Sequence, residues 1–254
     1  MPNRLEKLIC LVTGGSTGIG AAVARELAQQ GATVLITGRH EETLRTSAAQ
    51  HPAIHYLVAD VSKPADSGRV LEEIRTRYGR LDVLVNNAGI APIRPLSDAS
   101  PDHVREVLEV NVIGLVEITR QALPLLTASK GNVVNVASIL GLGGRGTKLS
   151  LYCTSKGGVV NMTRDLAIEL EPDIRVNCVC PGAVDTEMLQ DLGRSLGKGD
   201  VEAGYAILTQ GRPLKRVARA AEIANAIVFL ASDLASYTTG AMQVVDGGVM
   251  AKAG

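Results

Sequence analysis

The stretch LVTGGSTGIGAAVARELAQQGATVLITGRH, residues 11–40, decides the fold. An apolar run leads into a glycine-rich turn, an amphipathic stretch follows, and a second apolar run ends the segment. This order is typical of a strand, a helix and a second, parallel strand. Gly14, Gly18 and Gly20 allow the main chain to approach an anion closely at the helix N-terminus, where free N–H groups and the helix dipole attract negative charge. The turn predicts a pyrophosphate site; the alternative is a turn that only packs the helix on the strand.

Apolar runs and amphipathic stretches alternate along the rest of the chain. Several runs are apolar at consecutive positions, which indicates strands buried on both faces of a parallel sheet. The alternation predicts a right-handed, doubly wound α/β sheet with helices on both faces. The expected strands are seven, at 8–13, 33–37, 54–59, 82–86, 132–137, 175–180 and 242–245. The expected helices include 19–31, 66–79, 101–126 and 152–170.

The length of 254 residues is enough for a sizeable buried core. Because no Pro/Ser-rich linker or repeat divides the chain, we expect one domain spanning 1–254. The least regular part, about 183–215, is interrupted by glycines and lacks a sustained helical pattern. We expect this segment to be a mobile lid over a substrate site.

Charge and cysteine usage exclude several function classes. Lys plus Arg number 26, as do Asp plus Glu, so the formal net charge is zero and no basic field favours nucleic-acid binding. The N-terminal apolar run is only a few residues long before glycines interrupt it, which predicts neither a signal peptide nor a membrane span. The four cysteines have neither zinc-type nor C-x-x-C spacing. We therefore expect buried thiols in a cytoplasmic protein.

A second stretch, LYCTSKGGVVNMTRDLAIEL at 151–170, carries candidate chemistry. Tyr152 and Lys156 are four residues apart, so they share one helix face. A nearby ammonium lowers the pKa of a phenol from about 10, which allows proton exchange nearer neutral pH. The alternative is an ordinary helix pair without chemistry. Ser138 favours the chemical interpretation, because it follows the expected strand 132–137 at the sheet edge where α/β proteins bind ligands.

The ordered set of motifs resembles the short-chain dehydrogenase/reductase family over essentially the whole chain. The matching residues are Thr13-Gly14-x-x-x-Gly18-x-Gly20, Asp60-Val61, the NNAG motif at 86–89, Asn111, Ser138, Tyr152-x-x-x-Lys156, Pro181-Gly182 and the VVDGG motif near the C-terminus. The resemblance implies a Rossmann-type fold and a nicotinamide cofactor. It also implies hydride transfer between a carbonyl and a secondary alcohol.

The resemblance assigns a role to each candidate catalytic residue. Tyr152 is expected to be the general acid in reduction and the general base in oxidation. Ser138 would bond the carbonyl oxygen, and Lys156 would lower the pKa of Tyr152 and bind the nicotinamide ribose. Asn111 would hold a water that links Lys156 to a proton relay; the alternative is a structural Asn in its apolar run. No metal is expected, because the cofactor carries the hydride and the phenol carries the proton.

The resemblance also implies a set of cofactor contacts. Asp60 is expected to bond the adenine amino group; the alternative, compatible with it, is that Asp60 caps the following helix. Asn87 and Gly89 would line the adenosine ribose, and Thr186 would bond the nicotinamide carboxamide. The full expected set is Gly14, Ser16, Thr17, Gly18, Ile19, Gly20, Arg39, Asp60, Val61, Asn87, Ala88, Gly89, Tyr152, Lys156, Pro181, Gly182, Val184 and Thr186.

The end of the expected strand 33–37 selects the dinucleotide. A carboxylate there would bind the ribose 2′-OH of NAD, whereas a basic residue would accommodate the 2′-phosphate of NADP. Gly38 stands at the acid position and Arg39 follows it, so we predict NADP(H) over NAD(H). Thr17 argues against this, since NADP-preferring relatives often carry a second basic residue there. The alternatives are a surface arginine and an NAD-dependent alcohol dehydrogenase.

The remaining expectations concern substrate and assembly. Ile139, Leu140, Leu142, the 183–215 lid and Ile90-Ala91 are expected to wall a pocket for a small or medium, largely uncharged substrate. Arg145 and Lys148 would meet an acidic group or a carrier protein; the alternative, which we favour, is that they face solvent. The resemblance implies a homotetramer that pairs the helices at 103–127 and 152–170. The alternative from another class, a non-catalytic nucleotide-binding protein, would be expected to lack one of Ser138, Tyr152 and Lys156.

Overall fold

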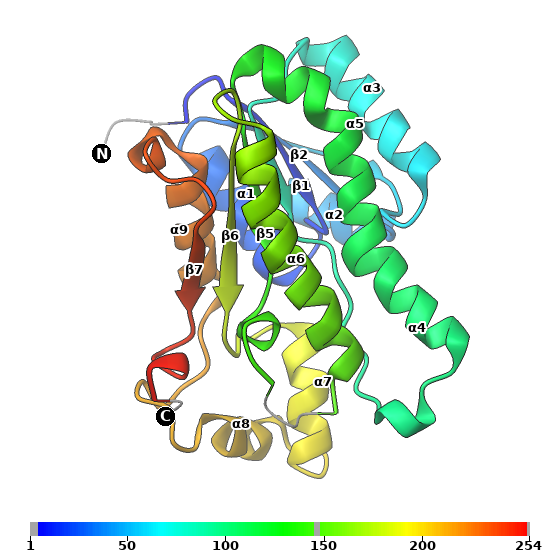
Figure 1. The fold of residues 1–254 in the computed structure, drawn as a ribbon, viewed down its shortest axis with the longest axis vertical. Coiled ribbons are helices and arrows are strands. Elements are labelled where there is room, and N and C mark those ends of the chain that lie inside the picture. The colour runs from blue at the N-terminus through cyan, green and yellow to red at the C-terminus, as the bar shows by residue number, and fades with distance from the viewer. Residues whose placement is uncertain (1–4, 145–147, 253–254) are drawn as a thin grey trace.

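The computed structural model describes residues 5–144 and 148–252, and within them parallel strands form a seven-stranded sheet in the order β3-β2-β1-β4-β5-β6-β7 (Figure 1). The predicted fold class is confirmed, and each strand lies within about one residue of its expected bounds because two-sided burial leaves a continuous apolar run. The strands are β1 Ile9–Thr13, β2 Thr33–Gly38, β3 Ile54–Val58, β4 Val83–Asn86, β5 Asn132–Val136, β6 Arg175–Pro181 and β7 Met242–Val245. The strand order reverses between β1 and β4, and such a switch point opens a ligand crevice at the carboxyl ends of the strands.

Helices cover both faces of the sheet (Figure 1). Their bounds are α1 Gly18–Gln29, α2 Glu41–Ala48, α3 Pro64–Tyr78, α4 Pro101–Leu108, α5 Gly114–Ser129, α6 Ser150–Glu169, α7 Glu187–Leu196, α8 Val201–Thr209 and α9 Ala220–Ala231. One face of β1, with Cys10 and Val12, packs in a core with α1 and α9. The other face, with Ile9 and Leu11, packs with α3 and α5. That the whole chain is a single domain stays a prediction.

A buried row of polar side chains ties the middle of the sheet to two helices. Asn86 donates to Thr119 Oγ1 and to Asn135 Oδ1, each at 2.9 Å, and Asn135 donates to Thr163 Oγ1 at 2.9 Å. All four residues are buried, so their polar groups bond to one another rather than to water. These bonds orient β4 and β5 against α5 and α6. The row holds the helix of Tyr152 in a defined register beside the strand that leads to Ser138.

The expected helix over 101–126 contains an irregular turn. Residues Glu109–Ile113 form a π-helix between α4 and α5, with Asn111 fully buried inside it. A π-turn inserts one extra residue into a helix and is frequent at functional sites. Helical periodicity predicts the helix itself but carries no signal for this insertion.

The 183–215 segment contains two helices that the sequence did not predict. α7 and α8 lie beyond the carboxyl ends of the strands (Figure 1). Two of the glycines that interrupt the helical pattern, Gly193 and Gly204, are points of contact, because a Cβ on Gly204 would overlap the carbonyl oxygen of Gly193. The mobility of this segment stays a prediction.

Among the described helices, none is long and apolar enough to cross a membrane. The cytoplasmic location stays a prediction.

Candidate active site and dinucleotide cavity

A cavity of about 560 Å³ lies at the carboxyl ends of the strands. Its wall includes every expected cofactor contact except Gly20, and it also includes Ser138. Gly20 lies behind the glycine turn, where a Cβ would overlap the Gly14 carbonyl oxygen, so the lack of a side chain allows the turn to close tightly. The expected contact of Gly20 with the cofactor stays a prediction.

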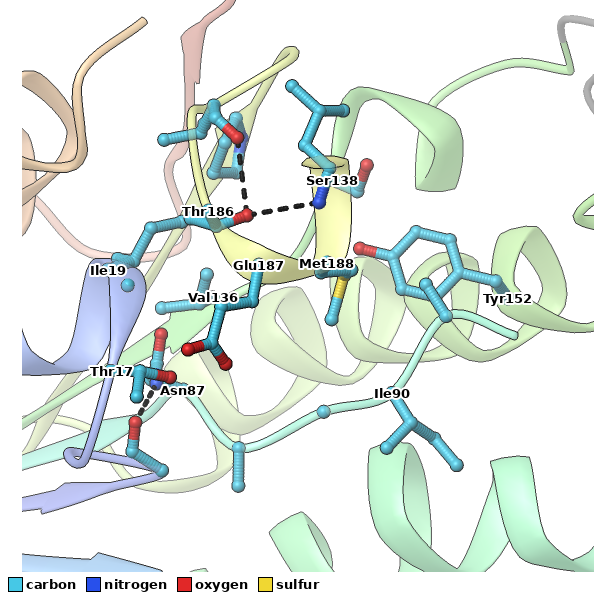
Figure 2. Close-up of a pocket in the computed structure, with 18 of the residues that line it drawn as sticks. Thr17, Ile19, Asn87, Ile90, Val136, Ser138, Tyr152, Thr186, Glu187 and Met188 are labelled. Atoms are coloured by element: carbon cyan, nitrogen blue, oxygen red, sulfur yellow. Dashed lines mark hydrogen bonds between the residues drawn. The ribbon is translucent and has the colours of Figure 1, made fainter. Parts of the chain in front are cut away.

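The glycine turn is built as an anion cradle. Gly14 and Gly18 have φ of 63° and 54°, in the left-handed region that favours glycine. Thr17, the N-cap of α1, makes no capping hydrogen bond with its side chain, so the first N–H groups of α1 are left for a ligand. Asn87, expected at the ribose, donates to the carbonyls of Thr13 and Gly14 at 3.0 and 2.9 Å, and Figure 2 draws one of these two bonds. Its amide group thereby joins the turn to the end of β4.

At one end of the cavity, Asp60 and the end of β2 lie on the wall. Asp60 Oδ1 accepts from the main chain and the hydroxyl of Ser62, at 3.0 and 2.7 Å. The N-cap of α3 is Lys63, so the alternative that Asp60 caps this helix is wrong; Asp60 lies three residues too early and forms an Asx turn instead. Arg39 is exposed on the same wall.

Ser138 and Tyr152 meet near the other end. Ser138 follows β5 and is buried, and its Oγ accepts from Leu140 N–H at 3.1 Å at the start of the short 3-10 turn Ile139–Gly141. Tyr152 lies in the first turn of α6, and its hydroxyl points into the cavity (Figure 2). The hydroxyl is hydrogen-bonded to Ser138. The two residues therefore form the pair that the sequence predicts.

The electrostatics of the pair differ from the expectation. Desolvation raises the pKa of Tyr152 to about 12, and the hydrogen bond with Ser138 only partly opposes it. Burial lowers the pKa of Lys156 to about 8. Lys156 Nζ donates to the Val136 carbonyl at 2.7 Å and lies 5.8 Å from the centre of the Tyr152 ring. The expected lowering of the Tyr152 pKa by Lys156 is wrong, because desolvation by burial has the largest effect on this pKa and raises it.

Asn111 lies behind the cavity wall and is fully buried. Its Oδ1 accepts from Ile90 N–H at 2.8 Å, and its Nδ2 donates to the Ile90 carbonyl at 2.9 Å and to Ser155 Oγ at 3.0 Å. Both amide hydrogens are therefore used, and the side chain holds the segment of the cavity wall at Ile90 against α6. A role in a proton relay stays a prediction.

The loop from β6 to α7 closes the cavity on the lid side. Thr186 is the N-cap of α7; its Oγ1 accepts from Leu189 N–H at 3.4 Å and donates to the Val184 carbonyl at 3.2 Å (Figure 2). Glu187 projects into the cavity next to it (Figure 2). The sequence predicted Thr186 individually and included Glu187 and Met188 only within the 183–215 segment; their position directly after Thr186 was the available signal.

Aliphatic side chains dominate the wall around Ser138 and Tyr152. They are Ile90, Ala91, Ile93, Ile139, Leu140, Leu149, Met188, Leu189, Leu192 and Leu208, and the charged Glu187 and Arg212 complete this side. Leu142, expected here, instead packs on the core formed by α6 and β6, because the 3-10 turn directs it away. Lys148 is exposed and is not part of the cavity wall. Arg145 lies outside the described residues.

Comparison with known proteins gives a consistent set of relatives. A family profile described as enoyl-(acyl carrier protein) reductase matches residues 14–250. L-fucose dehydrogenase of Bos taurus is 37% identical over 250 residues, covering 98% of this chain and 91% of the relative. Cis-4-hydroxycyclohexanecarboxylate dehydrogenase of Sinomonas cyclohexanicum is 39% identical over 249 residues, covering 96% of each.

A solved structure supports the same assignment. The crystal structure of levodione reductase superposes with a TM-score of 0.93 at 32% identity, covering 97% of this chain and 99% of that chain. The motifs, the cavity at the strand switch point and these relatives agree. The chain belongs to the short-chain dehydrogenase/reductase family, whose members are oxidoreductases that use a nicotinamide dinucleotide on small carbonyl and alcohol substrates.

Proposed function

We propose that the protein is an NADP(H)-dependent oxidoreductase that interconverts a ketone and a secondary alcohol, with Tyr152 as general acid and base. The observation that carries the proposal is the single cavity whose wall includes the glycine turn, Arg39, Ser138, Tyr152 and Lys156. The uncapped N-terminus of α1 and the tight glycine turn fit the pyrophosphate of such a cofactor. An NAD-dependent alcohol dehydrogenase with the same chemistry is the alternative.

The proposed mechanism uses the groups at the aliphatic end of the cavity. The dinucleotide, when bound, supplies hydride for reduction and accepts it for oxidation. Ser138 Oγ already accepts from Leu140 N–H, so its own hydrogen can be donated to the carbonyl oxygen, where negative charge develops. Tyr152 gives its proton to the same oxygen, and in the reverse direction takes one from the alcohol. Lys156 keeps N–H donors beyond the one given to Val136, and these bind the nicotinamide ribose.

The coenzyme preference is tested with Arg39. No hydrogen bond or ion pair engages this side chain within the described residues, so its guanidinium is free to bind a 2′-phosphate. We expect a higher kcat/KM with NADPH than with NADH, and we expect Arg39→Ala to lower the NADPH value by about tenfold while leaving NADH nearly unchanged. Arg45→Ala, on the exposed side of α2, is the matched control. A wild-type preference for NADH would contradict the proposal.

The aliphatic wall also bears on the substrate. Sugar hydroxyls placed against aliphatic side chains would lose water without gaining hydrogen bonds, which costs binding energy. We therefore propose an alicyclic or acyl ketone rather than a sugar. A panel of substituted cyclohexanones, 3-oxoacyl thioesters and aldohexoses, assayed with both coenzymes, should give at least about tenfold higher kcat/KM for one of the first two classes. A preference for aldohexoses would contradict this proposal. Cofactor binding without turnover of any compound would favour the non-catalytic alternative.

We further propose a homotetramer that pairs the helices at 103–127 and 152–170. Large apolar side chains are exposed on this face, among them Val116 and Ile168. A second exposed apolar face includes Phe229 of α9 and Val244 of the edge strand β7. A tetramer with dihedral symmetry needs two different self-complementary faces, and these two exposed apolar faces support the proposal. Light scattering should report about four times the chain mass; a monomer would contradict the proposal.

A further inference from the structure

One residue of the β6–α7 loop is held from outside the cavity. Val184 and Thr186 both line the cavity, whereas Asp185 between them does not. The Tyr205 hydroxyl of α8 donates to Asp185 Oδ1 at 2.8 Å, and Gln190 Nε2 donates to the same oxygen at 3.2 Å. Asp185 N–H donates to the Ala218 carbonyl at 2.8 Å. The loop that carries Thr186 is therefore fastened on its outer side to α8.

The tyrosine that makes this bond is itself fixed by packing. Tyr205 is 9% exposed, and its ring lies against Gly193 of α7, where a Cβ would be 3.2 Å from Tyr205 Cε1. One residue earlier, Gly204 crosses Gly193 so closely that a Cβ on Gly204 would overlap the main chain of Gly193. α7 and α8 thus form a tightly packed pair, and the position of α8 determines where the Tyr205 hydroxyl lies.

We propose that Tyr205 and Asp185 form a latch that positions Thr186 and the start of α7 against the nicotinamide end of the bound dinucleotide. The proposal rests on the proposed function. Tyr205 and Asp185 are positioning residues, because both act through the loop and neither lines the cavity. When the latch is broken, α8 no longer restrains the loop, so the cofactor must order it on binding.

The chemistry of Tyr205 and Asp185 favours a hydrogen bond that persists across the neutral pH range. Burial and then the hydrogen bond to Asp185 raise the pKa of Tyr205, so the phenol remains a donor throughout the neutral range. A hydrogen bond from a neutral phenol to a carboxylate is of the stronger, charge-assisted kind. Gln190, on the first half of α7, shares the carboxylate and so links it to the same helix.

Three single variants and one double variant test the latch with NADPH as the probe. Tyr205→Phe keeps the ring against Gly193 and removes only the hydroxyl, and Asp185→Ala removes the acceptor. Asp185→Asn keeps an acceptor oxygen for the tyrosine. We expect the first two to raise the Kd and KM for NADPH by about tenfold and to change kcat by less than about twofold. Asp185→Asn should stay within about twofold of the wild type, and the double variant Tyr205→Phe/Asp185→Ala should be no worse than either single variant.

Hydrogen exchange in the cofactor-free protein gives an independent readout. Loss of the latch should speed amide exchange in the loop at 184–187 while α1 and α9 are unaffected. Unchanged NADPH affinity and unchanged loop exchange in Tyr205→Phe would overturn the proposal, as would an Asp185→Asn variant as impaired as Asp185→Ala. If Tyr205→Phe fails to fold, the two Asp185 variants decide the matter. If the wild type binds neither NADPH nor NADH, the proposed function fails, whereas the exchange experiment still judges the latch.

Discussion

Replacing Tyr152 by Phe is expected to lower kcat by at least about a hundredfold, the low end for the loss of a general acid or base. The variant loses the only phenolic O–H that lines the cavity within the described residues, while the ring and its packing remain. The glycine turn and the loop of Thr186 are untouched, so the Kd for NADPH should stay within about twofold. Steady-state turnover of the best ketone, measured beside cofactor titration by fluorescence, checks both parts.

The chain offers a matched control for this substitution. Tyr237 is fully exposed and distant from the cavity wall, so Tyr237→Phe should leave kcat and the cofactor Kd unchanged. Turnover near the wild-type rate in Tyr152→Phe would refute the assignment of Tyr152 as the proton donor. A fall in turnover together with a large rise in Kd would point to a binding role for the phenol instead.

The second large effect concerns Lys156. Lys156→Met keeps the aliphatic stem and removes the ammonium, which is proposed to bind the nicotinamide ribose and so to hold the nicotinamide beside Tyr152. We expect kcat to fall by about a hundredfold and the Kd for NADPH to rise by about tenfold or more. Lys63→Met, on the exposed start of α3, is the control. A variant with reduced kcat but an unchanged Kd for NADPH would contradict the proposal that Lys156 binds the nicotinamide ribose.

The same substitution changes how the stability of the folded protein depends on pH. Burial lowers the pKa of Lys156 from its usual 10.5 to about 8, so between these values the folded protein carries fewer protons than the unfolded chain. Stability of the wild type therefore rises with pH across this window, and Lys156→Met lacks that gain. Thermal unfolding at about pH 7 and about pH 10 should show the Tm of the variant falling relative to wild type as pH rises. A constant Tm difference would contradict the shifted pKa.

The strands and the principal site residues could be predicted from the sequence for local reasons. Strands buried on both faces leave uninterrupted apolar runs, so β1 to β7 were identifiable without tertiary information. The glycine turn, Ser138, Tyr152 and Lys156 were predicted by their order and spacing. Sheet topology then brings the ends of β1, β5 and β6 to one edge, which is why residues far apart in the chain share one cavity.

The features that escaped prediction depend on packing between distant segments. Gly193 and Gly204 look like helix breakers in a single sequence, yet they allow α7 and α8 to cross. Leu142 faces the core because of the 3-10 turn after Ser138, and the periodicity of strand β5 does not extend as far as Leu142. The pKa of Tyr152 depends on how much water the surrounding residues exclude, a quantity that the four-residue spacing to Lys156 does not contain.

The π-turn at Glu109–Ile113 has a consequence for protein engineering. Deleting one residue there would convert the π-turn into an ordinary α-helical turn and leave α4 and α5 on nearly the same faces, because the turn absorbs the extra residue locally. The deletion would instead cost Asn111 the position from which it bonds Ile90. Chimaeras and length changes are therefore better placed in the stretch around Leu96, which is 62% exposed.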